Sequence, residues 1–378
     1  MRYSLLNFIV CQSCHGELTC VTLREARCEI SATIFSFCGR VSPADALVGP
    51  VPVWRHASAL AGRLERYATS AAPPDRNFIV ALEEGLLVCA ECGRWYPVTG
   101  FIPEILPDHL RNWDRDRTLL EKMSGSLPSD LLACLREFRP DVGPVVGQGE
   151  HYKLAEISLP RKIEDPSFWG PGYSAPFNPW NTEHTWHLIR NFALVEPLLD
   201  VRRGDAVLDL GCGYSWTTEW LLRSGYESVG FDICRAYLEI AVKRIGVDRP
   251  HLFVADVENL PIRNDSIHST LGFEAFHHIP NRVRAMAELA RALRPGGALV
   301  LAEPGPAHER SGTAAEVMEK FGTLEKGMEL DDVRNYAAGS SLTLAQQHLI
   351  LRFSETETKG CVPNNIMTLR KGASSGLS

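Results

Sequence analysis

An alternation of apolar runs and helical segments that begins near Asp205 most constrains what this chain can fold into. Extended, largely apolar runs that predict strands lie at 206–210, 228–232, 251–255, 267–273 and 298–303, and segments with helical character lie between them at 215–223, 234–245 and 282–293. Strands that alternate with helices predict an α/β fold with a parallel sheet and right-handed crossovers. Ligands of such sheets bind at the carboxyl ends of the strands.

The first predicted strand ends in a glycine loop, Asp209-Leu210-Gly211-Cys212-Gly213. Gly211 and Gly213 would let the backbone pass close under a ligand where the next helix begins. A dinucleotide site would need a third glycine at position 216, which is Trp216 here, and the carboxylate of Asp209 would repel a pyrophosphate. A ligand with a cationic aminoacyl group fits this loop better than NAD.

Aspartates also close the next two predicted strands. Asp232 stands 21 positions after Gly211, the reach at which a carboxylate can accept hydrogen bonds from a ribose diol. Asp256 ends the third strand, where it could accept from an adenine amino group. Either aspartate alone would more often be a loop residue or a helix cap. Together with Asp209 and the glycine loop, they favour a nucleoside site.

Four segments of this half, at 207–213, 230–233, 255–261 and 293–297, resemble class I methyltransferases of type 11, and the resemblance covers roughly residues 181–305. It implies a Rossmann-like, seven-stranded sheet, closed by an antiparallel pair of late strands at 348–353 and 365–369, and S-adenosylmethionine as the methyl donor. The residues that it implies around this cofactor are Asp209, Gly211 and Gly213 at the aminoacyl portion, Asp232 and Ile233 at the ribose, Asp256 and Val257 at the adenine, and Phe273 and Glu274 near the methyl group.

Two cysteine pairs near the start of the chain predict a metal centre. Cys11 and Cys14 form one pair and Cys89 and Cys92 the other, each with two residues between the thiols. Two such pairs complete a tetrahedral Zn²⁺ shell, and the glycine behind each pair, Gly16 or Gly93, permits the positive φ of a tight turn. Loop closure costs little for a long insert, so a structural zinc can tie the pairs together across it.

The segments 86–98 and 100–107 resemble the small zinc-ribbon activator subunit of tRNA and protein methyltransferases, which is also found fused ahead of methyltransferase domains. The resemblance implies an N-terminal zinc-ribbon domain. We therefore expect a zinc-ribbon domain with a long insert at 1–107, a linker or lid at 108–180, a methyltransferase domain at 181–370 and a disordered tail at 371–378. A helix is expected at 182–195, with Trp186, Ile189 and Leu194 near one face.

Methyl transfer needs a general base only when the acceptor starts protonated. His277 and His278 follow the fourth predicted strand, where a loop would face the cofactor cleft, and imidazole titrates near neutrality. Glu303 ends the fifth strand, where it could touch an acceptor or cap the sheet. These three residues are the catalytic candidates, and a role as ordinary loop residues is the alternative for the histidines.

Charge and composition limit the substrate. The chain has 378 residues with a formal net charge of −7, so no overall basic field would attract a nucleic acid. Eleven cysteines without a secretion signal, and no apolar run long enough to span a bilayer, predict a cytoplasmic protein. We expect a small-molecule acceptor, such as a specialised metabolite or a glycan or lipid precursor. The alternatives are an RNA methyltransferase and a non-enzymatic, cofactor-binding regulatory subunit that docks partners through its zinc ribbon.

Overall fold

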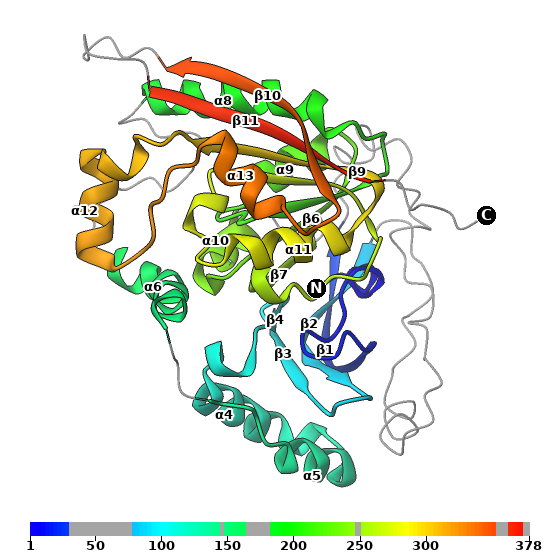
Figure 1. Ribbon diagram of the computed structural model, residues 1–378. Coiled ribbons are helices and arrows are strands. Elements are labelled where there is room, and N and C mark those ends of the chain that lie inside the picture. Colours follow the sequence, from blue (N-terminus) through cyan, green and yellow to red (C-terminus); the bar gives the residue numbers. More distant parts are fainter. Residues whose placement is uncertain (30–77, 144–146, 164–181, 246–250, 353–361, 373–378) are drawn as a thin grey trace.

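A single mixed sheet organises the protein. The computed structural model describes residues 1–29, 78–143, 147–163, 182–245, 251–352 and 362–372, and within these residues the sheet has the strand order β1-β2-β3-β4-β7-β6-β5-β8-β9-β11-β10 (Figure 1). The strands are β1 Leu18–Glu29, β2 Phe78–Cys89, β3 Trp95–Thr99, β4 Ile102–Ile105, β5 Ala206–Leu210, β6 Glu227–Asp232, β7 His251–Ala255, β8 Ile267–Phe273, β9 Leu293–Pro304, β10 Leu342–Arg352 and β11 Val362–Lys371.

The second half of the chain contributes the seven strands β5 to β11 to this sheet. Neighbours in the order β7-β6-β5-β8-β9 all pair in parallel, with β5 in the centre. β11 is inserted antiparallel between β9 and β10 and closes the edge. The α/β fold and the seven-stranded sheet predicted from the sequence are therefore confirmed, including the late antiparallel pair.

Helices cover both faces of the parallel sheet (Figure 1). Val207 and Val300 pack on one face with Leu188, Phe192 and Leu221, which belong to the helices α8 and α9. The adjacent residues in the same strands, Leu208 and Leu299, point to the other face and pack with α11 and α13. The helices are α4 Trp113–Met123, α5 Ser129–Glu137, α6 Gln148–Ile163, α8 Thr182–Val195, α9 Trp216–Arg223, α10 Arg235–Ile245, α11 Arg282–Ala292, α12 Gly312–Phe321 and α13 Leu330–Ala337.

Helix α8 begins and ends at the predicted residues. Leu188, Phe192 and Val195 are buried, and their i, i+4 and i+7 spacing is the stripe that one face of a helix presents to a core. Trp186 and Leu194, which the sequence places near one face, are exposed and lie outside this stripe.

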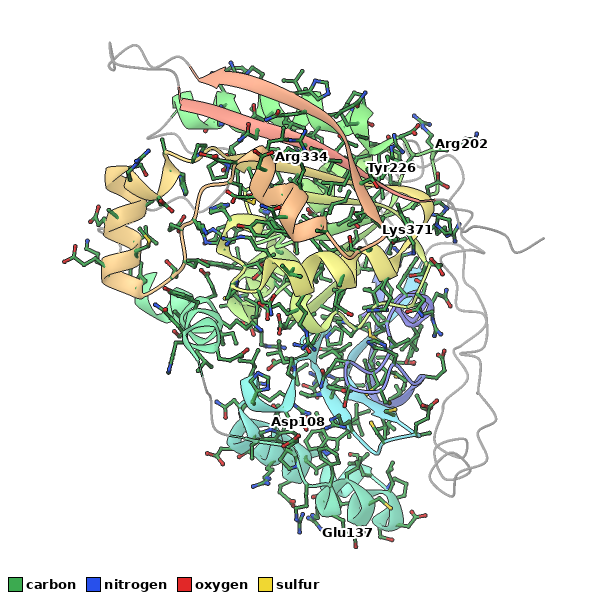
Figure 2. The ribbon with its side chains drawn as sticks, viewed as in Figure 1. Asp108, Glu137, Arg202, Tyr226, Arg334 and Lys371 are labelled. Carbon is green, nitrogen blue, oxygen red and sulfur yellow. The ribbon has the colours of Figure 1, made fainter. Side chains whose placement is uncertain are left out.

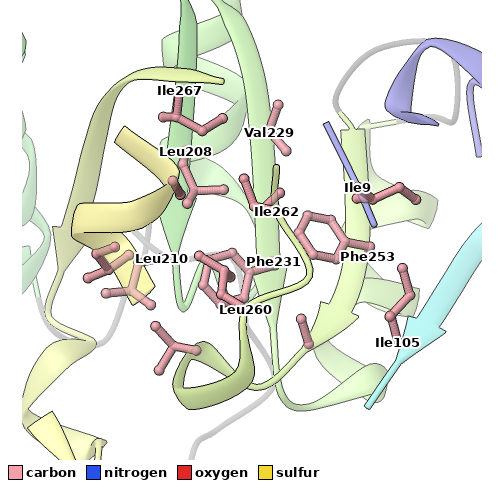
Figure 3. Packing of buried hydrophobic residues seen from close by; sticks show 14 of the residues in the cluster. Ile9, Ile105, Leu208, Leu210, Val229, Phe231, Phe253, Leu260, Ile262 and Ile267 are labelled. Carbon is pink, nitrogen blue, oxygen red and sulfur yellow. The ribbon is translucent and has the colours of Figure 1, made fainter. Parts of the chain in front are cut away.

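The N-terminal strands extend the parallel sheet directly. β4 pairs in parallel with β7, through Glu104 opposite Val254 and Ile105 opposite Ala255. A second link joins the first residues to the segment after β7, because Ile9 forms a bridge with Ile262. Figure 3 shows Ile9 and Ile105 packed beside Phe253 and Ile262 in one apolar cluster. The N-terminal strands and the parallel sheet thus share a core.

The region predicted as a linker or lid contains helices where the structure describes it. α4 and α5 pack on the N-terminal strands, where Leu120 and Leu131 join Trp95 and Val88 in a cluster. At the start of this region, Asp108 (Figure 2) accepts hydrogen bonds from Arg94, and its carbonyl accepts one from the Trp113 indole at 2.8 Å. The proline- and glycine-rich stretch at 168–180, residues 30–77 of the insert and residues 373–378 of the predicted tail lie outside the described residues. Lys371, which the prediction assigned to a disordered tail, is the last residue of β11. None of the helices described in the structure has the length and apolar character required to cross a membrane.

Candidate active site and zinc centre

The glycine loop after β5 has the close-packed backbone that the sequence predicts. Gly211 and Gly213 adopt positive φ values of 61° and 50°. A Cβ on Gly211 would lie 2.6 Å from the Cβ of Ala275, whereas a Cβ on Gly213 would meet nothing within 4 Å. The first glycine therefore allows β5 and the loop after β8 to approach each other, and the second leaves room above the loop for a ligand.

Asp232, at the end of β6, faces this loop. Its Oδ2 accepts a hydrogen bond from the backbone N–H of Gly213 at 2.9 Å, and its Oδ1 accepts one from Cys234 at 2.8 Å. Burial raises the pKa of Asp232 to about 6, although these backbone donors oppose the change. Each carboxylate oxygen keeps a further lone pair, so the group can still accept from a diol.

Asp209 is buried beneath the loop and contacts the start of α9. Its Oδ2 accepts hydrogen bonds from the hydroxyls of Thr217 and Thr218, at 2.7 and 2.5 Å. Burial raises its pKa to about 6. The carboxylate thus joins β5 to the helix that follows the glycine loop, a positioning role that the sequence did not indicate.

Asp256, at the end of β7, lies against helix α6. Its Oδ2 accepts from the ammonium of Lys153 at 3.0 Å, and Lys153 also donates to Glu258 at 2.6 Å. All three groups are buried. Burial lowers the pKa of Lys153, but the charges of Asp256 and Glu258 outweigh this effect and raise it. Helix α6 therefore lies over the end of the strand at which the adenine was expected.

The remaining residues expected around the cofactor lie at the same strand ends. Ile233 is half-buried beside the apolar cluster of α10, and Val257 is buried in the main core. Phe273 packs edge-on against Trp216, with ring centroids 5.2 Å apart. Glu274 follows in a left-handed conformation with φ 50°, and its Oε1 lies 3.8 Å from His187 on α8.

Beyond β8, the structure brings His277 and His278 together with Glu303. His277 Nδ1 lies 2.7 Å from Glu303 Oε2, and Glu303 Oε1 accepts from the backbone N–H of Phe276 at 2.8 Å. The second ring nitrogen of His277 is 3.4 Å from Glu325, a residue between α12 and α13. His278 Nδ1 lies 2.8 Å from the carbonyl oxygen of Leu324.

The two histidines differ in charge preference. Burial lowers the pKa of His277, but contacts with Glu303 and Glu325 outweigh this effect and raise the pKa to about 9. Burial, and then the charge of His277, lower the pKa of His278 to about 4. Without other ligands, His277 is therefore cationic at neutral pH and His278 is neutral.

The four predicted cysteines come together as expected. Cys11 Sγ lies 3.6 Å from Cys92 Sγ, and Cys14 Sγ lies 3.5 Å from Cys89 Sγ, with all four sulfurs within 4.8 Å of one another. Four sulfurs at ~2.3 Å from one Zn²⁺ would stand about 3.8 Å apart. The set fits a tetrahedral zinc ion, and the Tyr96 hydroxyl lies 3.1 Å from Cys11 Sγ as an outer partner.

The two cysteine turns differ in the residue that takes the left-handed conformation. Gly93 has φ 72° as predicted, but in the first turn His15 takes it, with φ 56°, rather than Gly16. A Cβ on Gly16 would lie 2.7 Å from Glu91 and 3.1 Å from Cys89 Sγ. Gly16 is thus needed because the turns approach closely, and the predicted positive φ at Gly16 was wrong.

Several residues at the site were missed from the sequence. Lys153 and Glu156 come from α6, and Glu325 and His308 come from the segments around α12. Glu150 and Lys153 have the i,i+3 spacing of a helical ion pair, a weak signal for α6. Glu325 belongs to no motif, so only the fold brings it to His277.

Comparison with known families and proteins separates the two halves of the chain. Residues 208–301 match the family model described as Methyltransferase domain, which spans β5 to β9 and every strand end described above. The chain carries a methyltransferase domain. Residues 2–100 match the family Trm112p-like protein, which spans the cysteine turns and β1 to β3. Both resemblances stated from the sequence are confirmed.

Three curated relatives show what the chain resembles. Methyltransferase GfsG of Streptomyces halstedii is 37% identical over 145 residues, which are 37% of this chain and 52% of that protein. Phthiotriol/phenolphthiotriol dimycocerosates methyltransferase 1 of Mycobacterium ulcerans is 32% identical over 28% of this chain and 40% of its own length. Probable tRNA methyltransferase 9B of Mus musculus is 33% identical over 34% of this chain and 27% of its own length. The chain thus spans about half or less of the curated relatives that it matches.

Proposed function

We propose that the protein is an S-adenosylmethionine-dependent methyltransferase that acts on a small molecule. The observation that carries this proposal is the match of residues 208–301 to the methyltransferase-domain family. Asp209 with the glycine loop, Asp232 and Asp256 lie at the carboxyl ends of three adjacent parallel strands, β5, β6 and β7. These ends meet at one edge of the sheet, where α/β proteins bind nucleosides.

Each strand end has a role in this proposal. Gly211 and Gly213 hold the aminoacyl portion of the cofactor against the backbone, and Asp209 fixes the loop through Thr217 and Thr218. Asp232 accepts from the ribose hydroxyls. Asp256 and Val257 border the adenine. When bound, S-adenosylmethionine supplies a methyl group on a sulfonium, so the chain mainly provides orientation and exclusion of water.

The acceptor side lies at the loop after β8. Ala275 lies close to Gly211, and His277 and His278 follow it two and three residues later, so we place the histidines beside the donor end of the site. We propose that an acceptor hydroxyl or amine binds beside this cluster and that its proton passes to solvent. Glu303 acts as a positioning residue, because its carboxylate holds the His277 ring at 2.7 Å.

A small-molecule acceptor is supported by the charge of the chain and by one relative. The formal net charge of −7 gives no general attraction for a polyanion. The relative named phthiotriol/phenolphthiotriol dimycocerosates methyltransferase 1 matches 108 residues of the chain. The test is incubation with methyl-labelled S-adenosylmethionine and separate small-metabolite and RNA extracts. Label in the small-metabolite fraction is the expected result, and its absence there, with label in RNA, would overturn the small-molecule assignment.

RNA remains the second candidate because of a specific observation. The Trm112p-like match at 2–100 stands beside a relative named as a probable tRNA methyltransferase. The labelling experiment separates these candidates. Release of no S-adenosylhomocysteine with any extract, from protein that binds the cofactor, would instead favour a regulatory subunit.

We also propose that one structural Zn²⁺ is bound by Cys11, Cys14, Cys89 and Cys92. All four thiols are free of disulfides, and three of them are buried or half-buried. A closed set of four thiolates leaves no open position for a substrate, so this ion would stabilise the Trm112p-like segment rather than take part in methyl transfer.

A further inference from the structure

We propose that His277, His278 and Glu325 form a second metal site, which binds a divalent first-row transition-metal ion beside the methyl-donor cleft. Each residue offers one ligand atom, and these atoms all lie within 4.8 Å of one another. The site is separate from the four cysteines, because its residues come from the loop after β8 and from the segment between α12 and α13.

The spacing in this cluster is close to that of a coordination shell. Two ligand atoms bound at ~2.1 Å to one ion, with an angle of 90–110° between them, stand about 3.0–3.5 Å apart. His277 Nε2 lies 3.4 Å from Glu325 Oε2. His308 Nε2 lies 2.9 Å from the same oxygen and could provide a fourth ligand. Small side-chain movements would therefore suffice to place an ion among these groups.

His277 has a carboxylate, Glu303, on the ring nitrogen that faces away from the proposed ion, and metal-binding histidines often have such a partner. Its Nδ1 is 2.7 Å from Glu303 Oε2, so Nε2 points toward Glu325. A carboxylate on the far ring nitrogen fixes the ring and increases its basicity as a ligand. Glu303 is in turn held by the backbone N–H groups of Ala275 and Phe276, at 3.2 and 2.8 Å.

A buried carboxylate oxygen in the cluster lacks a hydrogen-bond donor. Glu156, from α6, places its Oε1 3.5 Å from His278 Nδ1, beyond hydrogen-bonding distance, and this buried atom has no hydrogen-bond partner. Glu156 is the third carboxyl group of the cluster, beside Glu303 and Glu325. The imidazoles are those of His277, His278 and His308. An ion bound among these groups would give the unpartnered Glu156 oxygen a partner.

The ligand types select the class of ion. Imidazole nitrogens suit zinc, cobalt, nickel and iron, whereas magnesium and calcium prefer shells made of oxygen. An ion can reach the cluster, because the side chains of His278 and His308 are 31% and 27% exposed. The site is therefore partly open, as sites that also bind a substrate are.

The role of this ion in catalysis rests on the proposed function, but its binding does not. An acceptor hydroxyl bound to the ion would lose its proton to solvent more readily. The resulting oxygen would then bond to the methyl carbon as the carbon–sulfur bond of the donor breaks, leaving a neutral thioether. The ion thus favours an oxygen acceptor over an amine.

The test is calorimetric titration of the zinc-loaded protein with Co²⁺, without cofactor or acceptor. One Co²⁺ should bind per chain beyond the zinc of the four cysteines. His277→Ala and Glu325→Gln should each weaken this binding at least a hundredfold. Glu303→Gln should weaken it about 10- to 100-fold, the usual cost of losing an outer partner. His268→Ala is the matched control, since His268 also faces a carboxylate, Asp205 at 3.2 Å, at the opposite end of β8.

Two results would overturn the proposal. One is the absence of Co²⁺ binding by folded, zinc-loaded protein, and the other is binding that His277→Ala and Glu325→Gln leave unchanged. His308→Ala, at a partly exposed position, provides a variant that should fold normally and bind several-fold more weakly. Because no methyl donor is present, failure of this titration leaves the labelling experiment unaffected, and failure of methyl transfer leaves this titration unaffected.

Discussion

At the scale of single residues, two buried carboxylates control the proposed cofactor site. Asp209 and Asp232 are both buried, and both have a pKa raised to about 6 by that burial. Their backbone and hydroxyl donors stabilise the charged form only in part. The cofactor site should therefore respond to mild acid.

Binding of S-adenosylmethionine should weaken as the pH falls through about 6. Asp232 accepts from the ribose best as a carboxylate, and each pH unit below its pKa lowers the ionised fraction about tenfold. Affinity should be nearly constant from pH 7 to 8 and decline below pH 6, as measured by calorimetry at each pH. Asp232→Asn should remove the part of the pH dependence of affinity that comes from Asp232. Affinity that rises on acidification would contradict this role.

Gly211→Ala should damage the cofactor loop. The residue has φ 61°, and its new Cβ would lie 2.6 Å from Ala275. The left-handed conformation alone costs about 1–2 kcal/mol for an L-residue. We expect a lower free energy of unfolding in urea and at least a tenfold loss of cofactor affinity. Gly125→Ala is the control, because a Cβ there meets nothing within 4 Å and no positive φ is required. Equal behaviour of the two variants would show that the loop needs no glycine.

At the scale of elements, helix α6 ties the strand ends to the rest of the molecule. Leu154 and Ile157 pack against the cluster that contains Cys212 of the glycine loop. From the same helix, Lys153 is bound by Asp256 and Glu258, and Glu156 lies beside His278. The helix therefore contacts both the end of β7 and the loop after β8.

Lys153→Met should destabilise the protein. It keeps most of the side-chain volume but leaves Asp256 and Glu258 buried without their cation, and breaking such a pair typically costs about 3–5 kcal/mol. The free energy of unfolding, measured with urea, is the readout. Lys320→Met removes the exposed ion pair with Glu316 and should change it little. A loss of less than about 1 kcal/mol for Lys153→Met would indicate that α6 does not hold this ion pair in solution.

The elements that could be predicted from the sequence are those with local signals. The parallel strands are apolar runs with an acidic residue or a glycine at their carboxyl ends, and β7 and β8 begin and end at the predicted residues. Helix α13 was missed, because it is short and its capping box uses Glu329 and Asp332 rather than serine or threonine. The β4 to β7 pairing and the approach of Glu325 to His277 join distant segments, and no local pattern encodes such contacts.

At the scale of the whole molecule, the Trm112p-like segment and the methyltransferase domain form one structural unit. β4, which follows the segment and pairs with β3, joins its strands to β7 in one sheet, and Ile9 packs in the same core as Phe253. Arg235 of α10 also donates to the carbonyl of Thr99 in β3 at 2.8 Å. Stability of one part should therefore depend on the other.

Loss of zinc should weaken both parts together. Cys89→Ser removes one of the four thiolates, and structural zinc contributes about 10–16 kcal/mol in finger peptides, so the N-terminal turns should open. Hydrogen exchange should then show reduced protection of amides in β6 and β7 as well as in β2 and β3. Cys134→Ser, which lies on α5 outside the tetrad, is the control. Unchanged protection in β6 and β7 would mean that the domain folds independently of the zinc segment.

The central claim is that the edge formed by β5, β6 and β7 binds S-adenosylmethionine, and calorimetric titration of the zinc-loaded protein with this cofactor tests it most directly. We predict one site per chain with micromolar affinity, weakened at least tenfold by Asp232→Ala and unaffected by Asp331→Asn, an exposed aspartate on α13. No binding by folded, zinc-loaded protein, or equal binding by the Asp232 variant, would contradict the account.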